Sequence, residues 1–338
     1  MRRSKKIESL ASQHGLKIVS VDQLTIRRVR RGKGFSYRNG AGPVREKAEL
    51  ARLRSLAVPP AYIDVRFAKD PTAHLQAVGT DAAGRLQYRY HPDWTAVREA
   101  IKARHLGGLA RALPGINRAV ATALSSKEDS ASFAIAAVVH LVNLTAIRAG
   151  GESYAKEHGT RGATTLLKSN VRVVGGAIVL EFKAKGGKPV SKEIRDRRLQ
   201  AAMKRLMALP GRRLFQYRGA DGVMRAVRAD DVNGFLRSIA GRRISLKDFR
   251  TLVASAGALE TLAKTAPETS ERKRRAQLRA AVIPIADELS NTPTVCRTSY
   301  VHDSVVTAFE DGKLARLRRP PRSNKQKAEI LARLVSRS

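Results

Sequence analysis

The sequence of 338 residues has little cysteine, few acidic side chains and no long hydrophobic run. The single cysteine, Cys296, excludes a disulfide framework and a zinc site of the CxxC kind. The most apolar stretch, residues 133–142, contains a histidine and is too short to span a bilayer. No apolar run follows the basic start at residues 1–6, so we expect no signal peptide, no membrane partner and a cytoplasmic location.

The motifs of several common enzyme classes are also missing. No GxxxxGK followed by Ser or Thr is present, so the sequence predicts no P-loop and no use of ATP. The acidic residues are scattered, and the seven histidines show neither HxxxH nor HExxH spacing. A nuclease or polymerase that needs clustered carboxylates is therefore disfavoured, and we expect neither a metal site nor another cofactor.

Positive charge, by contrast, is abundant. Lys and Arg number 65 against 29 Asp and Glu, which gives a formal net charge of +36. Because 43% of the residues are hydrophobic, this composition indicates a folded protein and not a disordered polycation. Such a surplus predicts a polyanionic partner, foremost nucleic acid, since each neutralised phosphate releases counterions; an anionic membrane surface is the weaker alternative.

The first part of the chain divides into two segments. Residues 1–23 are polar and basic and predict a flexible N-terminal segment. Residues 24–92 contain short apolar runs, turn signals, one expected helix at 44–56 and an alternating, aromatic-rich strand at 84–90. We therefore expect a small β-rich domain over 24–92, with a nucleic-acid contact face as one interpretation of its aromatic strand.

The remainder is expected to be mainly helical. Residues 93–312 show a period of 3.6, and the expected helices cover 95–112, 114–125, 129–148, 192–208, 229–240, 245–263, 272–289 and 298–311. Among them, the segments 171–183 and 188–194 flank Gly186-Gly187, which indicates a hairpin. Residues 313–338 carry nine Lys or Arg against one acid and predict a basic tail or a loosely docked helix. The predicted fold class is thus α+β: a strand-rich first domain and a larger, mainly helical second domain with a small sheet.

Cleavage of a phosphodiester without metal requires three functions. Cationic or neutral donors must stabilise the non-bridging oxygens, an acid must protonate the departing alkoxide, and a nucleophile must attack. Arg and Lys suit the first two tasks, and Tyr suits the third.

Taken singly, each candidate for these tasks has an ordinary structural explanation. Arg148 precedes Gly150-Gly151 and suits the C-terminus of a helix. Lys185 lies at the expected hairpin tip, where lysines are usually solvated. Arg250 lies near a helix start, which is unfavourable for a cation and asks for another reason. Tyr300 follows a polar segment, and a lone tyrosine is usually a core or surface anchor.

Taken in order, the residues resemble the type IB DNA topoisomerases, most closely their small poxvirus-like bacterial branch. The matching positions are Arg148, a hairpin Lys185, Lys-Asp-Phe-Arg-Thr at 247–251, Asn-Thr-Pro at 291–293 and Tyr300. The resemblance covers about residues 24–311 and includes the first-domain sequences at 32–37, 58–62 and 84–90.

This resemblance implies a catalytic domain like that of tyrosine recombinases and a C-shaped clamp on double-stranded DNA. Tyr300 would form a 3′-phosphotyrosyl link and free a 5′-hydroxyl, the strand would swivel, and religation would leave positive or negative supercoils relaxed without ATP or metal. Arg148 and Arg250 would hold the non-bridging oxygens, and Lys185 would protonate the leaving 5′-oxygen. The positions that would contact DNA are Gln87, Tyr88, Tyr90 and Tyr154. A monomeric bacterial enzyme of the nucleoid is implied as well.

Two positions remain open. Asn291 stands where many relatives carry a histidine; an amide can donate a hydrogen bond but cannot shuttle a proton, which affects rate and pH dependence. Lys183 and Lys188 are close enough in sequence to take the place of Lys185.

The alternatives are a tyrosine recombinase and a non-catalytic DNA-packaging protein. Recombinases usually have HxxR where this chain has Lys247-Asp248-Phe249-Arg250, and their first domain is helical. A packaging protein would account for the charge but not for the ordered residues.

Overall fold

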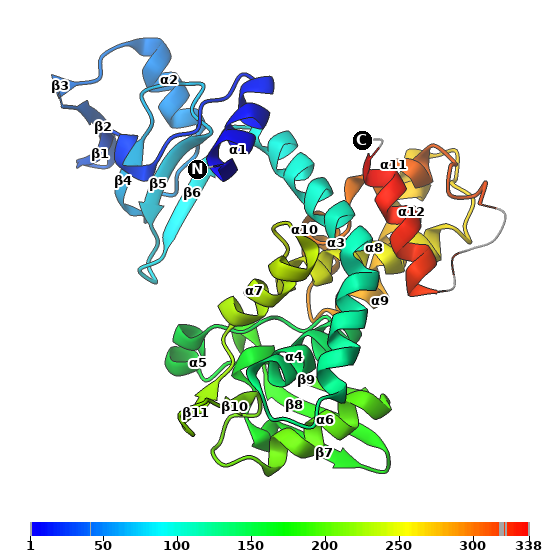
Figure 1. Ribbon diagram of the computed structural model, residues 1–338. Coiled ribbons are helices and arrows are strands. Elements are labelled where there is room, and N and C mark those ends of the chain that lie inside the picture. Colours follow the sequence, from blue (N-terminus) through cyan, green and yellow to red (C-terminus); the bar gives the residue numbers. More distant parts are fainter. Residues whose placement is uncertain (1, 41, 318–320, 322, 337–338) are drawn as a thin grey trace. The chain divides into compact units, whose positions relative to one another are not determined.

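The computed structural model describes residues 2–40, 42–317, 321 and 323–336 (Figure 1). The chain mixes helix and sheet, as expected, and divides into two compact units, residues 1–101 and 102–338. The division lies within helix α3 (Trp94–Ser125) and not at residue 93, because the start of α3 packs in the first unit: Val97 is fully buried with Leu10, Ala11 and Leu16. Each unit is described by itself.

The first unit is built on an antiparallel sheet in the order β3-β2-β1-β4-β5-β6. Its strands are β1 (Ile26–Arg31), β2 (Gly34–Asn39), β3 (Gly42–Pro43), β4 (Ile63–Phe67), β5 (Leu75–Thr80) and β6 (Leu86–Tyr90). The β1–β2 hairpin turns at Gly32-Lys33, where Gly32 has a φ of +58°, a conformation that glycine adopts at little cost. The aromatic strand expected at 84–90 is therefore β6, at one edge of the sheet.

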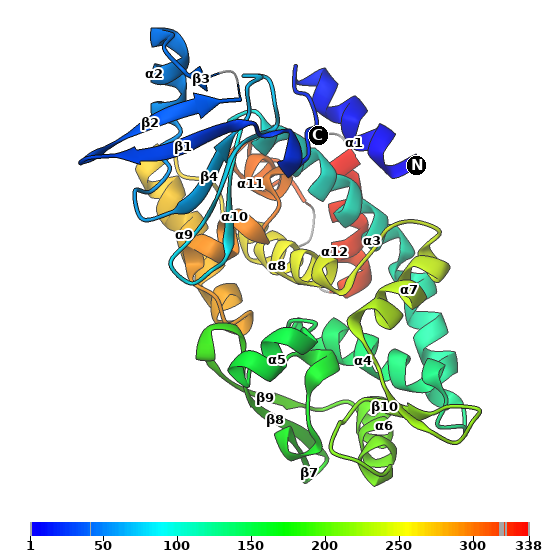
Figure 2. The ribbon, with the colours of Figure 1, turned by 90° about the vertical axis from the view of Figure 1, so that its left-hand side faces the viewer.

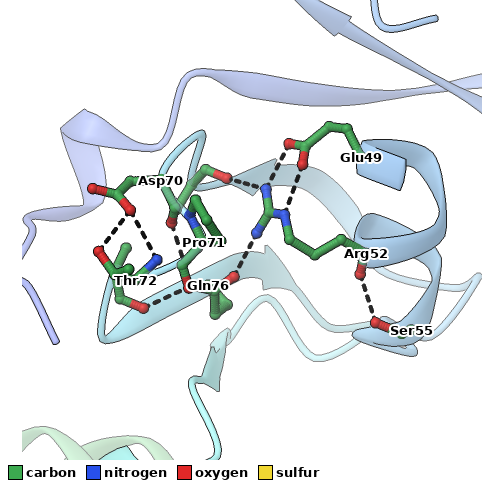
Figure 3. Close-up of polar contacts among 9 residues, drawn as sticks. Glu49, Arg52, Ser55, Asp70, Pro71, Thr72 and Gln76 are labelled. Atoms are coloured by element: carbon green, nitrogen blue, oxygen red, sulfur yellow. Dashed lines mark hydrogen bonds and ion pairs between the residues drawn. The ribbon is translucent and has the colours of Figure 1, made fainter. Parts of the chain in front are cut away.

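A partly buried polar network fixes helix α2 (Lys47–Ser55) on this sheet (Figure 3). The Arg52 guanidinium donates to both carboxylate oxygens of Glu49, to the carbonyl of Ala68 at 2.7 Å and to Oε1 of Gln76 at 2.5 Å. Gln76, only 2% exposed, donates in turn to the Ala73 carbonyl at 2.7 Å. The network thus joins α2 to β5 and to the loop before it.

Replacing Arg52 by Met should destabilise the protein. Gln76 and the Ala68 carbonyl would lose a donor in a poorly hydrated place, which costs about 1–3 kcal/mol. Urea denaturation followed by circular dichroism measures the change. Arg54→Met, at an exposed position of the same helix, is the control and should change the free energy of unfolding by less than about 0.5 kcal/mol. Equal stability of the two variants would contradict the prediction.

The N-terminal segment is more ordered than its composition suggests. Helix α1 (Arg2–Gln13) occupies much of residues 1–23, and a one-turn helix follows at Val21–Gln23. The prediction of a flexible segment is wrong for this part, because Leu10, Ala11 and Leu16 are apolar anchors buried in the first unit.

The second unit is mainly helical (Figure 2). Its helices are the rest of α3, α4 (Ala131–Thr145), α5 (Glu152–His158), α6 (Arg197–Ala208), α7 (Ala229–Ala240), α8 (Leu246–Leu262), α9 (Glu271–Glu288), α10 (Pro293–Ser299), α11 (Asp303–Glu310) and α12 (Asn324–Ser336). One sheet has the order β7-β8-β9, and a second pairs β10 with β11. The strands are β7 (Val171–Val174), β8 (Ala177–Lys183), β9 (Pro189–Ile194), β10 (Gln216–Arg218) and β11 (Met224–Ala226), with single helical turns at Ala163–Thr165, Lys168–Asn170 and Lys185–Gly187.

Several boundaries differ from the predicted ones. The helices expected at 95–112 and 114–125 are one helix, because Pro114 removes a single donor while its neighbour Leu113 remains packed in the core. The helix expected at 298–311 is two helices, α10 and α11, with the chain leaving helical geometry at Tyr300. The segment 171–183 turns at Gly175-Gly176 and forms two strands.

The C-terminal residues also fold onto the second unit. Helix α12 contacts α8 and α11, with Ala328, Leu331 and Val335 in the core. Lys327 also pairs with Glu260 of α8. Residues 324–336 therefore form a packed helix and not a tail, whereas residues 318–320, 322, 337 and 338 lie outside the described residues. Among the described residues, no helix is long and apolar enough to cross a membrane.

Candidate active site

The apolar helix α4 delivers Arg148 to the site. The helix ends at Thr145, and Ala146 caps it in the left-handed conformation with a φ of +50°. The loop beyond pairs with residues 162–164, because the Arg148 carbonyl accepts from the Ala163 N–H at 2.8 Å. This approach requires glycine at 162, since a β-carbon there would lie 2.6 Å from the Arg148 carbonyl oxygen. Arg148 therefore lies in the loop three residues beyond the last residue of α4, and the prediction that it closes a helix over 129–148 is wrong, because the chain turns out of the helix at Ala146.

The C-terminus of α9 gathers the cations of the site. Arg250 donates to the Leu289 carbonyl and Lys192 to the Glu288 carbonyl, each at 2.9 Å. Asn291 lies three residues beyond the end of α9. Its Oδ1 accepts from Arg148 at 2.7 Å, and its Nδ2 donates to the Leu289 carbonyl at 3.1 Å. Carbonyls at a helix C-terminus carry partial negative charge, so this end of α9 offsets repulsion among three neighbouring cations.

Arg250 is the most deeply buried charge of this group. It lies in the first turns of α8, which begins at a capping box of Ser245 and Asp248, and only 3% of it is exposed. Its guanidinium also donates to the Ala146 carbonyl, so it joins the ends of α4 and α9. Burial lowers its pKa, although arginine remains charged. Its Nε is buried and has no hydrogen-bond partner among the described residues.

Tyr300 lies beside Arg250, at the junction of α10 and α11. The guanidinium carbon of Arg250 is 4.7 Å from the centre of the tyrosine ring. Burial by itself raises the pKa of this phenol, but the charge of Arg250, then of Arg148 and Lys247, outweighs burial and lowers the pKa below its ordinary value of 10.0. The structure therefore brings a half-buried tyrosine with increased acidity together with Arg148, Arg250 and Asn291.

The cationic side chains line one concavity. Arg148, Arg161, Lys192 and Arg250 contribute to its wall, together with Ile147, Phe182, Ala184, Val190, Glu288, Leu289 and Ser290. Arg161 and Lys192 were not identified as site residues from the sequence. Lys192 had a signal: on β9 it lies between the buried Val190 and Ile194 on the same face, so a lysine occupies the inward face of a strand. Arg161 lies in a loop and had none.

Lys185 lies at the tip of the β8–β9 hairpin, as predicted. It is exposed in a single helical turn, and Gly186 and Gly187 after it have φ of +78° and +73°. Its ammonium is 5.4 Å from the centre of the exposed Tyr154 ring, so these two predicted residues lie together. Lys183 and Lys188 are exposed nearby on the same hairpin. Within the described residues, no hydrogen bond joins Lys185 to Tyr300 or to either arginine.

Gln87, Tyr88 and Tyr90 lie on β6 in the first unit. The two tyrosines are 42% and 41% exposed and stack at a ring separation of 6.2 Å, and Trp94 stacks on Tyr90 at the same separation. Gln87 donates to the Asp81 carboxylate at 2.8 Å. Exposed aromatic faces on an edge strand are suited to contact with nucleic acid.

The described residues contain no group of three His, Cys, Asp or Glu side chains able to hold a metal ion. The one cysteine, Cys296, is buried on α10, and burial raises its pKa to about 11.

Comparison with known proteins identifies both units. Residues 95–328 match the family described as eukaryotic DNA topoisomerase I, catalytic core, and residues 34–81 match the bacterial DNA topoisomerase IB, N-terminal domain. The DNA topoisomerase 1B of Acanthamoeba polyphaga mimivirus is 29% identical over 271 residues, which cover 78% of this chain and 80% of the viral protein.

Proposed function

The chain belongs to the type IB DNA topoisomerase family, and on this basis we propose that Tyr300 is the nucleophile with which it cleaves one strand of duplex DNA. The observation that supports this role is the Tyr300 ring beside the buried Arg250, with Arg148 and Asn291 joined by a hydrogen bond on the same site. Membership of this isomerase family sets aside the recombinase and packaging alternatives.

Cleavage begins when the Tyr300 oxygen attacks the phosphorus of a backbone phosphate. A bond forms between the phenolic oxygen and phosphorus, and the bond from phosphorus to the 5′-oxygen breaks. The products are a 3′-phosphotyrosyl link and a free 5′-hydroxyl. Because the link conserves the energy of the phosphodiester, the 5′-hydroxyl can attack it in reverse after the strand has swivelled. The neighbouring charges that lower the Tyr300 pKa favour the attacking phenolate.

Arg148 and Arg250 stabilise the non-bridging oxygens as charge develops on them. The terminal nitrogens of Arg250 carry four N–H donors, and two hydrogen bonds to backbone carbonyls leave two of these N–H groups for the phosphate. Asn291 uses one amide N–H on Leu289 and retains a second for a phosphate oxygen. Arg161 and Lys192 add positive potential at the same concavity.

Lys185 protonates the leaving 5′-oxygen in this mechanism. The support is its place in the chain: Ala184, the preceding residue, lines the concavity with Arg148 and Arg250, so the hairpin tip begins at the wall of the site. Lys183 and Lys188 remain alternatives for this task. A comparison of Lys→Ala variants at the three positions distinguishes them.

The first unit contributes a second DNA contact in this proposal. Gln87, Tyr88 and Tyr90 of β6, with Tyr154 of the second unit, contact the duplex near the cleaved bond, and the two units close on DNA as a C-shaped clamp. Exposure of the aromatic rings supports this role. We also propose that one chain acts alone, because Arg148, Arg250, Asn291 and Tyr300 meet within a single chain. Its proposed location is the cytoplasm, on the bacterial nucleoid.

Relaxation of supercoiled plasmid in EDTA and without ATP tests the function. We expect the purified chain to relax both negative and positive supercoils, because swivelling about the intact strand follows either sign of torque. Binding should weaken steeply with salt, because phosphate contacts release counterions. A chain that binds plasmid yet relaxes neither sign would contradict the proposal.

A further inference from the structure

The turn that carries Tyr300 joins two helices. The Tyr300 N–H still donates to the Cys296 carbonyl of α10 at 3.0 Å. The Tyr300 carbonyl, however, lies beyond the last helical residue and accepts no hydrogen bond within α10. Two residues later, His302 is the N-cap of α11, and its N–H precedes the hydrogen bonds of that helix. The backbone on both sides of Val301 therefore needs partners from elsewhere in the fold.

Ser255 of α8 supplies both partners. Its hydroxyl donates to the Tyr300 carbonyl at 3.2 Å and accepts from the His302 N–H at 3.0 Å. The side chain is fully buried, at 0% exposure. A serine hydroxyl has one donor and can also accept, so a single side chain satisfies both backbone groups.

The same helix also holds the tyrosine ring. Arg250 lies five residues before Ser255 on α8, and its guanidinium lies against the Tyr300 ring. One rigid element thus contacts both the backbone and the side chain of this residue. Lys102 of α3 adds a third support, since its ammonium donates to the Val301 carbonyl at 3.3 Å.

We propose that Ser255 is a positioning residue for cleavage: its hydroxyl fixes the backbone of the Tyr300 turn and thereby holds the tyrosine ring against Arg250. This inference rests on the proposed role of Tyr300 as nucleophile. Loss of the hydroxyl frees the turn to shift, and small displacements of a reacting group reduce rates strongly.

Ser255→Ala in the full chain tests the proposal. Excess protein is mixed with supercoiled plasmid and quenched with detergent, and the rate of formation of nicked, protein-linked plasmid is measured, so that no preferred cleavage site need be known. We expect this rate to fall about 10–100-fold, as for a misplaced reacting group, while the Kd for DNA changes by less than about threefold. Ser255→Thr, which retains the hydroxyl, should recover most of the rate.

A matched control separates positioning from general stability. Leu262 is buried on α8, seven residues beyond Ser255, and Leu262→Val removes packing without touching the Tyr300 turn. We expect Leu262→Val to lower Tm yet to cleave at the wild-type rate. If it loses as much cleavage as Ser255→Ala at a similar Tm, or if Ser255→Ala cleaves like the wild type, the proposal is wrong.

The pH profile provides a second readout. The groups that lower the Tyr300 pKa are Arg250, Arg148 and Lys247, acting against burial. A ring displaced from Arg250 loses part of this effect, so the alkaline rise in cleavage rate should move to higher pH in Ser255→Ala and remain in place in Leu262→Val. An unshifted profile in Ser255→Ala contradicts the inference but leaves the proposed function intact. A wild-type chain without a covalent adduct overturns both.

Discussion

Tyr300→Phe is expected to bind supercoiled DNA as tightly as the wild-type chain and to relax none of it. The phenylalanine ring retains the packing against Arg250 but has no oxygen to attack phosphorus. Removal of a catalytic nucleophile lowers the rate by about 10⁶-fold in the best-studied cases, so activity should fall below detection. Plasmid relaxation and a detergent-quenched assay for protein-linked DNA measure the loss, and fluorescence anisotropy measures binding.

Tyr217→Phe is the matched control. Tyr217 lies on β10 in the same unit and packs against the core, so its variant carries the same chemical change away from the site. It should relax plasmid at the wild-type rate. Residual relaxation by Tyr300→Phe, with a covalent adduct that maps to another tyrosine, would show that the nucleophile has been assigned wrongly.

Arg250→Ala should have the second largest effect. Cleavage is expected to fall by about 10²–10³-fold or more, the usual cost of removing a donor that stabilises developing negative charge. The buried Ala146 carbonyl would also lose its donor, and the Leu289 carbonyl would keep only Asn291, which reduces stability by about 1–3 kcal/mol. Single-turnover cleavage at saturating DNA and thermal denaturation separate the two effects.

The controls for Arg250 address charge and pH. Arg237→Ala, at an exposed position of α7, removes one positive charge from the surface and should leave the cleavage rate unchanged. In the wild type, the rate should rise with pH and level off below the ordinary tyrosine value of 10.0, because the lowered pKa increases the phenolate at a given pH. In Arg250→Gln the rise should move upward, since the largest lowering charge is gone. An unchanged profile would mean that Arg250 does not act on Tyr300.

Helices with complete local signals were predictable from the sequence. Helix α7 begins and ends where periodicity placed it, because Asp231 accepts the Arg228 N–H at its start and Gly241 ends it with a φ of +60°. The boundaries of α8 and α9 lie within one residue of those predicted. These signals are interactions between residues close in the chain, so the chain order alone contains them.

Elements that depend on distant contacts were not predictable in the same way. Pro114 is a local stop signal, yet the surrounding core keeps α3 continuous. The basic composition of residues 313–338 predicted a tail or a loosely docked helix, yet three apolar side chains of α12 pack in the core. In both places burial of apolar surface outweighs the local preference.

The family and the order of the candidate residues follow from the sequence, because motif spacing is a property of the chain and the two family matches rest on it. The arrangement of those residues does not. Arg148, Lys192 and Arg250 gather at one end of α9, and Ser255 supports the Tyr300 turn. These contacts join residues that are 39 to 143 positions apart in the chain. Such contacts exist only after the helices have packed, because each polar group finds its partner across an interface that the local sequence does not encode.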